Sequence, residues 1–292
     1  MNVSAYIGLM RPEQWVKNLF VLMPLFFSGR MLCGDLALQA LLAFVAFCAL
    51  ASAIYCLNDL HDVEADRRHP RKRLRPLARG VATPSGAVAL MCVLTLFSMG
   101  VAAVCRQWEW LEATLLVYLL LNVAYCLWLK RFAVIDVIAV ALGYVLRLMA
   151  GACVCGVSLS PWIVLLTFMG TLFLAIAKRR DDLVICRDTG VCGRKSLRGY
   201  SMRCVDLALC LVASVTMVCY VLYTVSPEVM HRIGSRHVCL TSLFVLGGLL
   251  RYLWLAFVDE DTGSPTRVLL HDRFLQVCVA GWIVAFGMLI YV

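Results

Sequence analysis

Charged residues are scarce in this chain of 292 residues. They make up 15% of the sequence, whereas a soluble domain carries roughly 25%. Hydrophobic residues make up 62%, and the mean hydropathy is +0.86. A soluble globule of this composition would expose too much hydrocarbon to water, which excludes a soluble enzyme, a disordered chain and a fibrous protein. The composition therefore indicates a protein that crosses a membrane several times.

Nine apolar stretches approach the length of about 20 residues that a membrane-spanning helix needs. They cover approximately residues 16–32, 36–57, 86–105, 110–129, 133–153, 161–177, 205–225, 238–258 and 274–292. The first is short and contains Pro24, so we expect it to be tilted, broken or partly interfacial. No low-complexity linker separates the others. The sequence predicts an all-α, polytopic bundle of nine transmembrane helices that forms one domain over residues 1–292.

The 15 cysteines include no CxxC pair of the kind that binds zinc. Most lie singly within apolar stretches, and we interpret them as free thiols that pack as small hydrophobic side chains. Two close pairs, Cys153 with Cys155 and Cys186 with Cys192, remain alternatives for disulfide bonds.

Lysine and arginine residues are distributed unequally between the two sides of the predicted spans. Twenty-one of them fall on the side of the N-terminus and four on the opposite side. Because positive residues are enriched in cytoplasmic loops, we expect the N-terminus and the large basic loops to lie in the cytoplasm. The chain is then a multi-pass protein of the cytoplasmic (inner) membrane.

A row of oxygen ligands follows the second predicted span. Asn58, Asp62 and Asp66 are four residues apart, so a continuing helix would place them on one face at intervals of about 6 Å. These side chains suit a Mg²⁺ ion that completes its coordination with water and substrate phosphate. His61 and His69 lack further zinc ligands at zinc-site spacing. The row therefore predicts a site for Mg²⁺ and a diphosphate.

Two basic clusters lie in the predicted cytoplasmic loops. The first covers residues 67–79, and the second begins at Lys178-Arg179-Arg180 and continues to Arg203. Guanidinium groups bind phosphate oxygens through paired hydrogen bonds. Acids for a metal beside bases for phosphates make up a polyphosphate site. For the bases alone, a loop that only maintains membrane topology is an equally good interpretation.

Charged and polar side chains also occur inside the predicted spans, where they are costly and usually functional. Asp136 and Arg147 share one face of the fifth span but are too far apart, at roughly 16 Å along the helix, to pair directly. Tyr118, Asn122 and Tyr125 share a face of the fourth span. These residues line a substrate cavity, or they form structural contacts between helices.

The acidic row within nine predicted spans resembles the UbiA prenyltransferase superfamily. Further stretches resemble its decaprenyl-phosphate phosphoribosyltransferase branch: Arg11 to Asn18 (RPEQWVKN), His69 to Gly80 (HPRKRLRPLARG), Lys178-Arg179-Arg180 and Leu269 to Arg273 (LLHDR). The resemblance extends over essentially the whole chain. It implies a UbiA-like helical bundle.

The resemblance also implies a reaction. Enzymes of this branch transfer 5-phosphoribose from 5-phosphoribosyl 1-diphosphate (PRPP) to a polyprenyl phosphate and release diphosphate. The product is a precursor of arabinose donors for the cell envelope. Ordinary superfamily members carry a second Asp-rich motif after the sixth span, whereas this chain has Lys178-Arg179-Arg180-Asp181-Asp182 there. This departure disfavours an aromatic prenyltransferase and fits a donor that carries an additional 5-phosphate.

We accordingly expect Asp62 and Asp66, assisted by Asn58, to act in catalysis by binding Mg²⁺. The expected substrate-binding residues are Lys17, Asn18, Arg67, Lys72, Arg75, Tyr125, Lys130, Arg131, Arg147, Lys178, Arg179 and Tyr200. The expected partners are PRPP, a polyprenyl phosphate, membrane lipids and a second or third copy of the chain, but no nucleic acid. Three alternatives remain: an aromatic prenyltransferase that uses a prenyl diphosphate, a lipid-phosphate transferase that uses a nucleotide sugar, and a transporter.

Overall fold

The computed structural model describes residues 3–68, 72–190, 195–259, 268–269 and 271–291. Within these ranges every regular element is a helix and no strand occurs, which confirms the all-α fold class. The chain divides into two compact units, Met1–Leu159 with Gly193–Ser196, and Ser160–Cys192 with Leu197–Val292. One domain over residues 1–292 stays a prediction.

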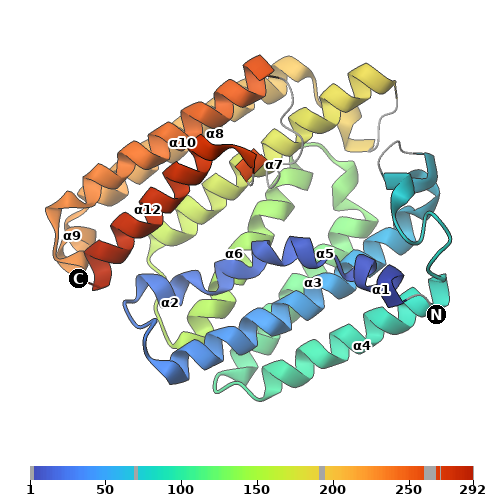
Figure 1. Cartoon of the computed structure of the whole chain (residues 1–292), viewed down its shortest axis with the longest axis horizontal. Coiled ribbons are helices and arrows are strands. Elements are labelled where there is room, and N and C mark those ends of the chain that lie inside the picture. The colour runs from blue at the N-terminus through green and yellow to red at the C-terminus, as the bar shows by residue number, and fades with distance from the viewer. Residues whose placement is uncertain (1–2, 69–71, 191–194, 260–267, 270, 292) are drawn as a thin grey trace. The chain divides into compact units, whose positions relative to one another are not determined.

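The first unit is built around one long helix, α3, Gly34–Arg68. Helices α4 (Pro84–Ala103), α5 (Trp108–Leu127) and α6 (Ile135–Cys155) pack against it (Figure 1). The shorter elements of the unit are α1 (Val3–Met10), the 3-10 helix η1 (Pro12–Val21), α2 (Met23–Phe27), η2 (Lys72–Leu74) and η3 (Leu129–Arg131). Because other helices surround α3, polar side chains are accommodated mainly at its ends. The acidic residues from Asp59 to Asp66 lie at its C-terminal end.

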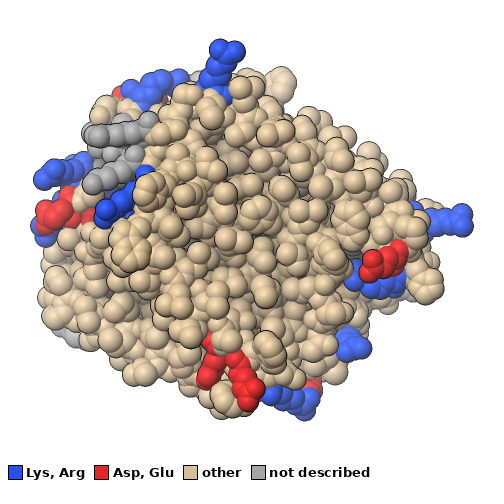
Figure 2. All heavy atoms as spheres, turned by 180° about the vertical axis from the view of Figure 1, so that it is seen from behind, with Lys and Arg blue, Asp and Glu red and all other residues tan. Residues whose placement is uncertain are grey.

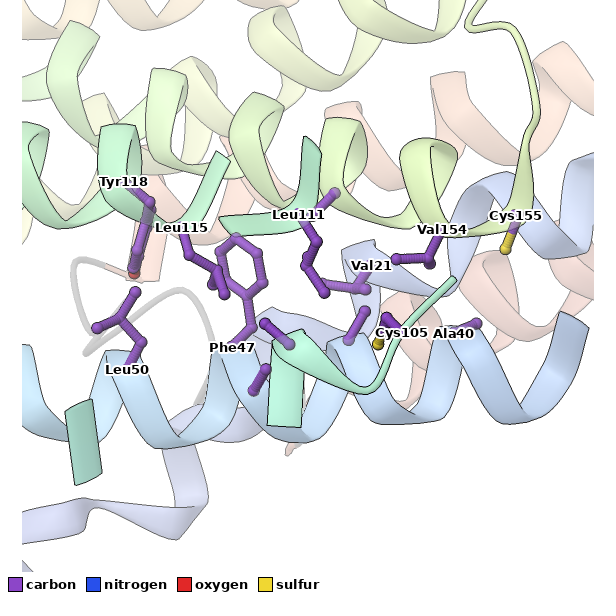
Figure 3. Packing of buried hydrophobic residues seen from close by; sticks show 14 of the residues in the cluster. Val21, Ala40, Phe47, Leu50, Cys105, Leu111, Leu115, Tyr118, Val154 and Cys155 are labelled. Atoms are coloured by element: carbon purple, nitrogen blue, oxygen red, sulfur yellow. The ribbon is translucent and has the colours of Figure 1, made fainter. Parts of the chain in front are cut away.

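The core of this unit lies between α3, α5 and α6. Phe47 of α3 is fully buried and points between Leu111, Leu115 and Tyr118 of α5 (Figure 3). Its ring centroid lies 5.1 Å from that of Tyr118. Small residues of α3, such as Ala40 and Ala43, are also fully buried and allow the neighbouring helices to approach closely.

The first of the nine predicted spans, which we expected to be tilted, broken or partly interfacial, is broken. In the described part of the chain, eight helices are long and apolar enough to cross a membrane, and they coincide with the other eight predicted spans. Residues 16–21 belong to η1 and residues 23–27 to α2, with the break at Leu22. Pro24, in the first turn of α2, cannot donate an amide hydrogen to a preceding helix, so one continuous α-helix is not formed.

The end of η1 approaches α6 so closely that only glycine fits there. A Cβ atom on Gly151 would lie 1.8 Å from the carbonyl oxygen of Val21. Val21 is fully buried and, with Leu25 of α2, belongs to the core cluster of this unit. The first segment of the chain is therefore packed into the bundle even though it is not one continuous helix.

The second unit contains α7 (Pro161–Thr189), α8 (Met202–Val225), α9 (Pro227–Ile233), η5 (Arg236–Thr241), α10 (Ser242–Trp254), η6 (Leu255–Asp259) and α12 (Arg273–Tyr291). Ser160 caps α7 by accepting a hydrogen bond from the amide of Ile163. Helix α7 continues well past Ala177, where the predicted span ends. The hydroxyl of Tyr220 on α8 accepts a hydrogen bond from Trp282 Nε1 of α12 at 2.6 Å and contacts Thr241 Oγ1 at 2.8 Å. This chain of polar contacts ties α8, α12 and η5 together.

The surface is apolar over broad areas. Figure 2 shows one face on which Lys, Arg, Asp and Glu lie at the edges and leave a wide area between them free of charge. Side chains such as Leu96 of α4 and Leu211 of α8 are mostly exposed. Exposed apolar helices of this length are expected to contact lipid, which supports a multi-pass membrane protein.

The cysteine prediction is largely confirmed. Thirteen described cysteines are free, Cys153 and Cys155 among them. Cys186 is disulfide-bonded, and its predicted partner, Cys192, lies outside the described residues.

Candidate active site

The acidic residues occupy the last three turns of α3, because this helix runs without interruption to Arg68. The predicted spacing of Asn58, Asp62 and Asp66 on one helix is therefore retained. Their contacts separate them into two pairs. Asn58 and Asp62 face one basic side chain, and Asp66 shares another with Asp59.

Lys130 bridges the first pair. Its ammonium group lies 2.6 Å from Asp62 Oδ1 and 3.4 Å from Asn58 Oδ1. Lys130 belongs to η3, directly after α5, so this contact joins α5 to the end of α3. Cys126 of α5 also approaches Asn58 Oδ1, with its sulfur at 3.6 Å. The two oxygen atoms of Asn58 and Asp62 therefore converge on one cation.

Arg75 bridges the second pair. Its Nη1 atom lies 2.5 Å from Asp66 Oδ2 and 3.1 Å from Asp59 Oδ1. Arg11 also forms an ion pair with Asp59 Oδ1. The other carboxylate oxygen of Asp59, Oδ2, is buried and has no hydrogen-bond partner among the described residues. A buried carboxylate oxygen without a donor is costly, which marks Asp59 as part of a site rather than of the core.

Sequence reasoning missed Asp59 and the contact of Arg11. Asp59 follows Asn58 directly and precedes Asp66 by seven residues, almost two helical turns, so the helical period itself would have placed Asp59 and Asp66 on one face. Arg11 lies 48 positions from Asp59. No local pattern connects them, and the contact depends on how η1 packs.

The 3-10 helix η1 lies along α3 in the opposite direction. At its start Arg11 pairs with Asp59; in its middle Trp15 Nε1 donates a hydrogen bond to Ser52 Oγ at 3.0 Å. Near its end Asn18 Nδ2 donates to Cys48 Sγ at 3.2 Å. These contacts hold η1 on one side of α3, so its basic residues have defined positions beside the acidic pairs.

Arg11 and Val134 are the two non-glycine residues with positive φ in the described part of the chain, at 52° and 69°. This region is unfavourable for both residue types. Arg11 begins η1, and Val134 lies between η3 and α6. Backbone strain of this kind is commonly retained where the surrounding structure positions functional groups.

Arg147 is buried at the centre of the unit and is fully engaged by polar and aromatic partners. Its Nε atom donates to Asn18 Oδ1 at 2.7 Å, Nη1 to the carbonyl oxygen of Gly143 at 2.9 Å, and Nη2 to Tyr118 Oη at 2.6 Å. The guanidinium also lies 4.8 Å from the ring centre of Tyr118 and 5.0 Å from that of Tyr144. Two predicted substrate-binding residues, Asn18 and Arg147, thus contact each other.

Lys17 lies in η1, outside the eight candidate spans. Burial, together with the positive charges of Arg147 and Arg11, lowers the pKa of Lys17 from 10.5 to about 8. A lysine in this environment is attracted to any anion that enters the site. Because its pKa is about 8, Lys17 also loses its proton in mildly alkaline solution.

Asp136, at the start of α6, is fully buried. Its Oδ2 atom accepts a hydrogen bond from Ser196 Oγ at 3.1 Å. The remaining predicted ligands of the first unit are less enclosed. Arg67 is exposed and pairs with Glu64 at 2.7 Å, Arg131 is exposed, and Lys72 and Tyr125 are partly buried.

Three predicted ligands belong to the second unit. Arg179 is buried and donates to Asp182 Oδ2 at 2.9 Å, Lys178 is exposed, and Tyr200 is partly buried. Next to them, Arg180 is buried and pairs with Asp206 of α8 at 2.8 Å. The guanidinium of Arg180 also lies 5.2 Å from the ring centre of Phe257. In α7 the acid Asp182 is therefore matched by an arginine of its own helix.

The oxygen ligands of the first unit suit a magnesium ion that takes only some of its ligands from the protein. Within the described ranges, no three His, Cys, Asp or Glu side chains cluster as a metal site. The converging oxygens of Asn58 and Asp62 instead provide one amide and one carboxylate, and Asp66 follows one turn later. Mg²⁺ commonly takes one or two protein carboxylates and completes its shell with water and phosphate oxygens. The donor set thus fits Mg²⁺ that is bound together with a phosphate ligand.

Two relatives match nearly the whole chain. The decaprenyl-phosphate phosphoribosyltransferase of Mycolicibacterium smegmatis is 37% identical over 99% of this chain and 93% of its own. The enzyme of the same name from Corynebacterium glutamicum is 34% identical over 98% of this chain and 86% of its own.

Among solved structures, a UbiA homologue from Archaeoglobus fulgidus bound to DMAPP and Mg²⁺ has the same fold. The TM-score is 0.71 at 18% sequence identity, over 98% of both chains. A model of the UbiA prenyltransferase family matches residues 21–275. The predicted resemblance is confirmed, and this chain belongs to the UbiA prenyltransferase family.

Proposed function

We propose that this protein transfers 5-phosphoribose from PRPP to a polyprenyl phosphate of the decaprenyl phosphate type, releases diphosphate and requires Mg²⁺. The relatives that carry the corresponding name match nearly the whole chain. The observation that carries the proposal is the mixed charge at the end of α3. Three carboxylates there contact three basic side chains, Arg11, Arg75 and Lys130. Acids for a divalent cation beside bases for phosphates suit a reaction between two phosphorylated substrates.

The acidic row binds the diphosphate end of the donor. Asp62 and Asp66, with the amide oxygen of Asn58, would hold Mg²⁺, which when bound neutralises the charge that develops on the departing diphosphate. Lys130 and Arg75 lie against the same carboxylates and bind phosphate oxygens of the donor. These residues act by positioning and by electrostatic stabilisation.

The chemistry exchanges one bond at C1 of the ribose. The bond from C1 to the diphosphate oxygen breaks, and the diphosphate leaves with its electron pair. An oxygen atom of the lipid phosphate forms the new bond to C1 from the opposite face, which inverts the anomeric configuration. Because this oxygen is already anionic, no side chain has to remove a proton from it. The enzyme's main task is to hold two anions together against their repulsion, for which Lys17 and Arg11 supply further positive charge.

The basic second motif supports PRPP as the donor. Lys178 and Arg179 lie in the C-terminal half of α7. They would supply positive charge for the additional phosphate of the donor, and Arg131 and Tyr200 are further ligands in this proposal. The lipid tail stays in the membrane, against the apolar side chains that the spanning helices expose. The same apolar faces would permit a dimer or a trimer. The excess of positive residues on one side of the predicted spans supports a cytoplasmic N-terminus and cytoplasmic basic loops.

The donor is tested by offering two alternatives in parallel. Purified protein in detergent receives decaprenyl phosphate and PRPP in one reaction, and a prenyl diphosphate with an aromatic acceptor in the other, both with Mg²⁺. The lipid products are identified by mass spectrometry. The proposal predicts phosphoribosylated lipid phosphate in the first reaction and no product in the second. A prenylated ring in the second reaction, with no product in the first, would contradict it and favour an aromatic prenyltransferase.

A further inference from the structure

The oxygen atoms proposed to bind Mg²⁺ are each in contact with a cation of the chain itself. Lys130 Nζ lies 2.6 Å from Asp62 Oδ1 and 3.4 Å from Asn58 Oδ1. Arg75 Nη1 lies 2.5 Å from Asp66 Oδ2 and 3.1 Å from Asp59 Oδ1. In this state the acidic row is neutralised without any ligand.

The two cations differ in how easily they can leave. The two carboxylates that hold Arg75 are buried, since the Asp66 side chain is 5% exposed and the Asp59 side chain 1%. In the pair of Lys130 and Asp62, the carboxylate is 28% exposed, although the Lys130 side chain, at 13%, is less exposed than that of Arg75, at 23%. An ammonium on a flexible four-carbon chain also moves more readily than a guanidinium held by two carboxylates. Lys130, which one carboxylate holds, is therefore the cation that exchanges more readily.

A divalent cation that arrives alone meets two obstacles at this place. It is repelled by the ammonium of Lys130, and if it displaces that ammonium, it leaves a partly buried positive charge without a partner. A diphosphate removes both obstacles, because its oxygens can accept the ammonium and complete the coordination of the metal.

We propose that Lys130 occupies the cation position between Asn58 and Asp62 in the free protein, so that the divalent cation and the diphosphate of the donor enter together. On binding, the ammonium of Lys130 moves from Asp62 to a diphosphate oxygen. Lys130 thereby excludes metal from the empty site and couples metal binding to donor binding. This inference rests on the proposed function, since that function assigns Asn58 and Asp62 to the metal.

The coupling is measured directly by metal binding without turnover. Mn²⁺, which accepts the same oxygen ligands as Mg²⁺, is titrated into the purified protein in detergent, and free Mn²⁺ is followed by electron paramagnetic resonance. The titration is run with and without inorganic diphosphate, with the affinity of diphosphate itself for Mn²⁺ taken into account. The wild-type protein should bind Mn²⁺ weakly alone and about tenfold or more tightly with diphosphate, a coupling of ordinary size.

Lys130→Gln keeps a hydrogen-bond donor but removes the charge. It should bind Mn²⁺ tightly without diphosphate and lose most of the tightening that diphosphate causes. Lys130→Arg, which keeps the charge, should exclude the metal as the wild-type protein does and serves as the second variant if Lys130→Gln folds poorly. Arg106→Gln is the matched control. Arg106 pairs at 2.5 Å with Asp35, which lies in α3 as Asp62 does. Asp35 is 27 positions before Asp62, which corresponds to roughly 40 Å along the helix.

Equal Mn²⁺ affinity of the wild-type protein with and without diphosphate, unchanged in Lys130→Gln, would overturn the inference. So would a Lys130→Gln protein that still requires diphosphate to bind Mn²⁺. The transfer assay with PRPP on the same wild-type preparation separates these failures from that of the function. Transfer without coupling rejects the role of Lys130 alone, whereas coupling without transfer from PRPP rejects the proposed donor and leaves the role of Lys130 for another diphosphate substrate.

Discussion

Asn18 accepts a hydrogen bond of 2.7 Å from the buried guanidinium of Arg147, a residue 129 positions away in the chain. The contact joins the end of η1 to the middle of α6. Because η1 also carries Arg11 and Lys17, the pair determines where two basic residues of the site lie. Both residues were expected to bind substrate, but the geometry gives each a clear structural task as well.

Removal of the Asn18 side chain is therefore expected to destabilise the protein. Asn18→Ala leaves Arg147 Nε without its acceptor in a buried environment, at a cost of about 1–3 kcal/mol. Thermal unfolding in detergent measures the loss. Asn18→Asp keeps an acceptor oxygen and should unfold close to the wild-type temperature. An Asn18→Ala protein as stable as the wild type would show that this contact does not hold η1.

Asp59 is not among the predicted metal ligands, but we expect it to contribute strongly to the stability of the folded protein. Asp59→Ala would leave Arg11 and Arg75 without a shared carboxylate in a largely buried place, and we expect a loss of roughly 3 kcal/mol. Asp35→Ala is the control, since its pair with Arg106 is on the surface and should contribute below about 1 kcal/mol. Equal unfolding temperatures for the two variants would contradict this account of Asp59.

Donor binding should weaken above the pKa of Lys17. Burial and the charges of Arg147 and Arg11 lower this pKa to about 8, so the ammonium is lost from the free enzyme as the pH rises through 8. Bound phosphate favours the charged form, so the decline should appear in kcat/KM for PRPP more strongly than in kcat. Lys17→Arg should keep its charge and abolish the decline. If the pH profile of kcat/KM in this variant matches that of the wild type, the decline belongs to another group.

The same pKa affects stability with the opposite sign. Between about 8 and 10.5 the unfolded chain binds more protons at Lys17 than the folded chain does. The contribution of Lys17 to the free energy of unfolding therefore rises with pH across this window. Wild-type protein without substrate should gain stability relative to Lys17→Met as the pH increases from 8 to 10, which thermal unfolding can measure.

Gly151 should not tolerate a side chain. A Cβ atom there would lie 1.8 Å from the carbonyl oxygen of Val21, so Gly151→Ala must push η1 away from α6. We expect a loss of about 1–3 kcal/mol, seen as a lower unfolding temperature. Gly100→Ala provides the comparison, because a Cβ atom at Gly100 in α4 meets no neighbour within 4 Å and alanine favours a helix. A Gly151→Ala protein as stable as Gly100→Ala would disprove the close approach.

The sequence predicted those features that depend on spacing within one helix. Eight spans were found because each is a long, predominantly apolar helical segment, and the row of Asn58, Asp62 and Asp66 was found because α3 continues through it. Pro24 led us to expect a tilted, broken or partly interfacial first span, but apolar composition does not predict that it forms a 3-10 helix followed by a short α-helix.

Contacts between distant segments were beyond local patterns. The sequence placed Lys130, Arg75 and Asp62 in one site, but not the pairing of Lys130 with Asp62 or of Arg75 with Asp59 and Asp66. These pairs depend on the packing of segments separated by up to 68 positions. The same limit applies to Asn18 and Arg147, whose shared hydrogen bond forms only when η1 lies beside α6.

The most direct test of the central claim is transfer of label from PRPP to lipid by the wild-type protein and Asp62→Asn. Asp62→Asn removes a carboxylate that contacts Lys130 and is proposed to bind Mg²⁺. Glu64→Gln on the same helix is the control, since Glu64 is exposed and pairs only at the surface with Arg67.

We expect wild-type protein and Glu64→Gln to move label from PRPP into the organic phase, with loss of transfer on addition of EDTA. Asp62→Asn should be slower by on the order of 100-fold even at saturating Mg²⁺. Transfer by Asp62→Asn at the wild-type rate, or transfer that persists in EDTA, would contradict a metal-dependent phosphoribosyl transfer at the end of α3.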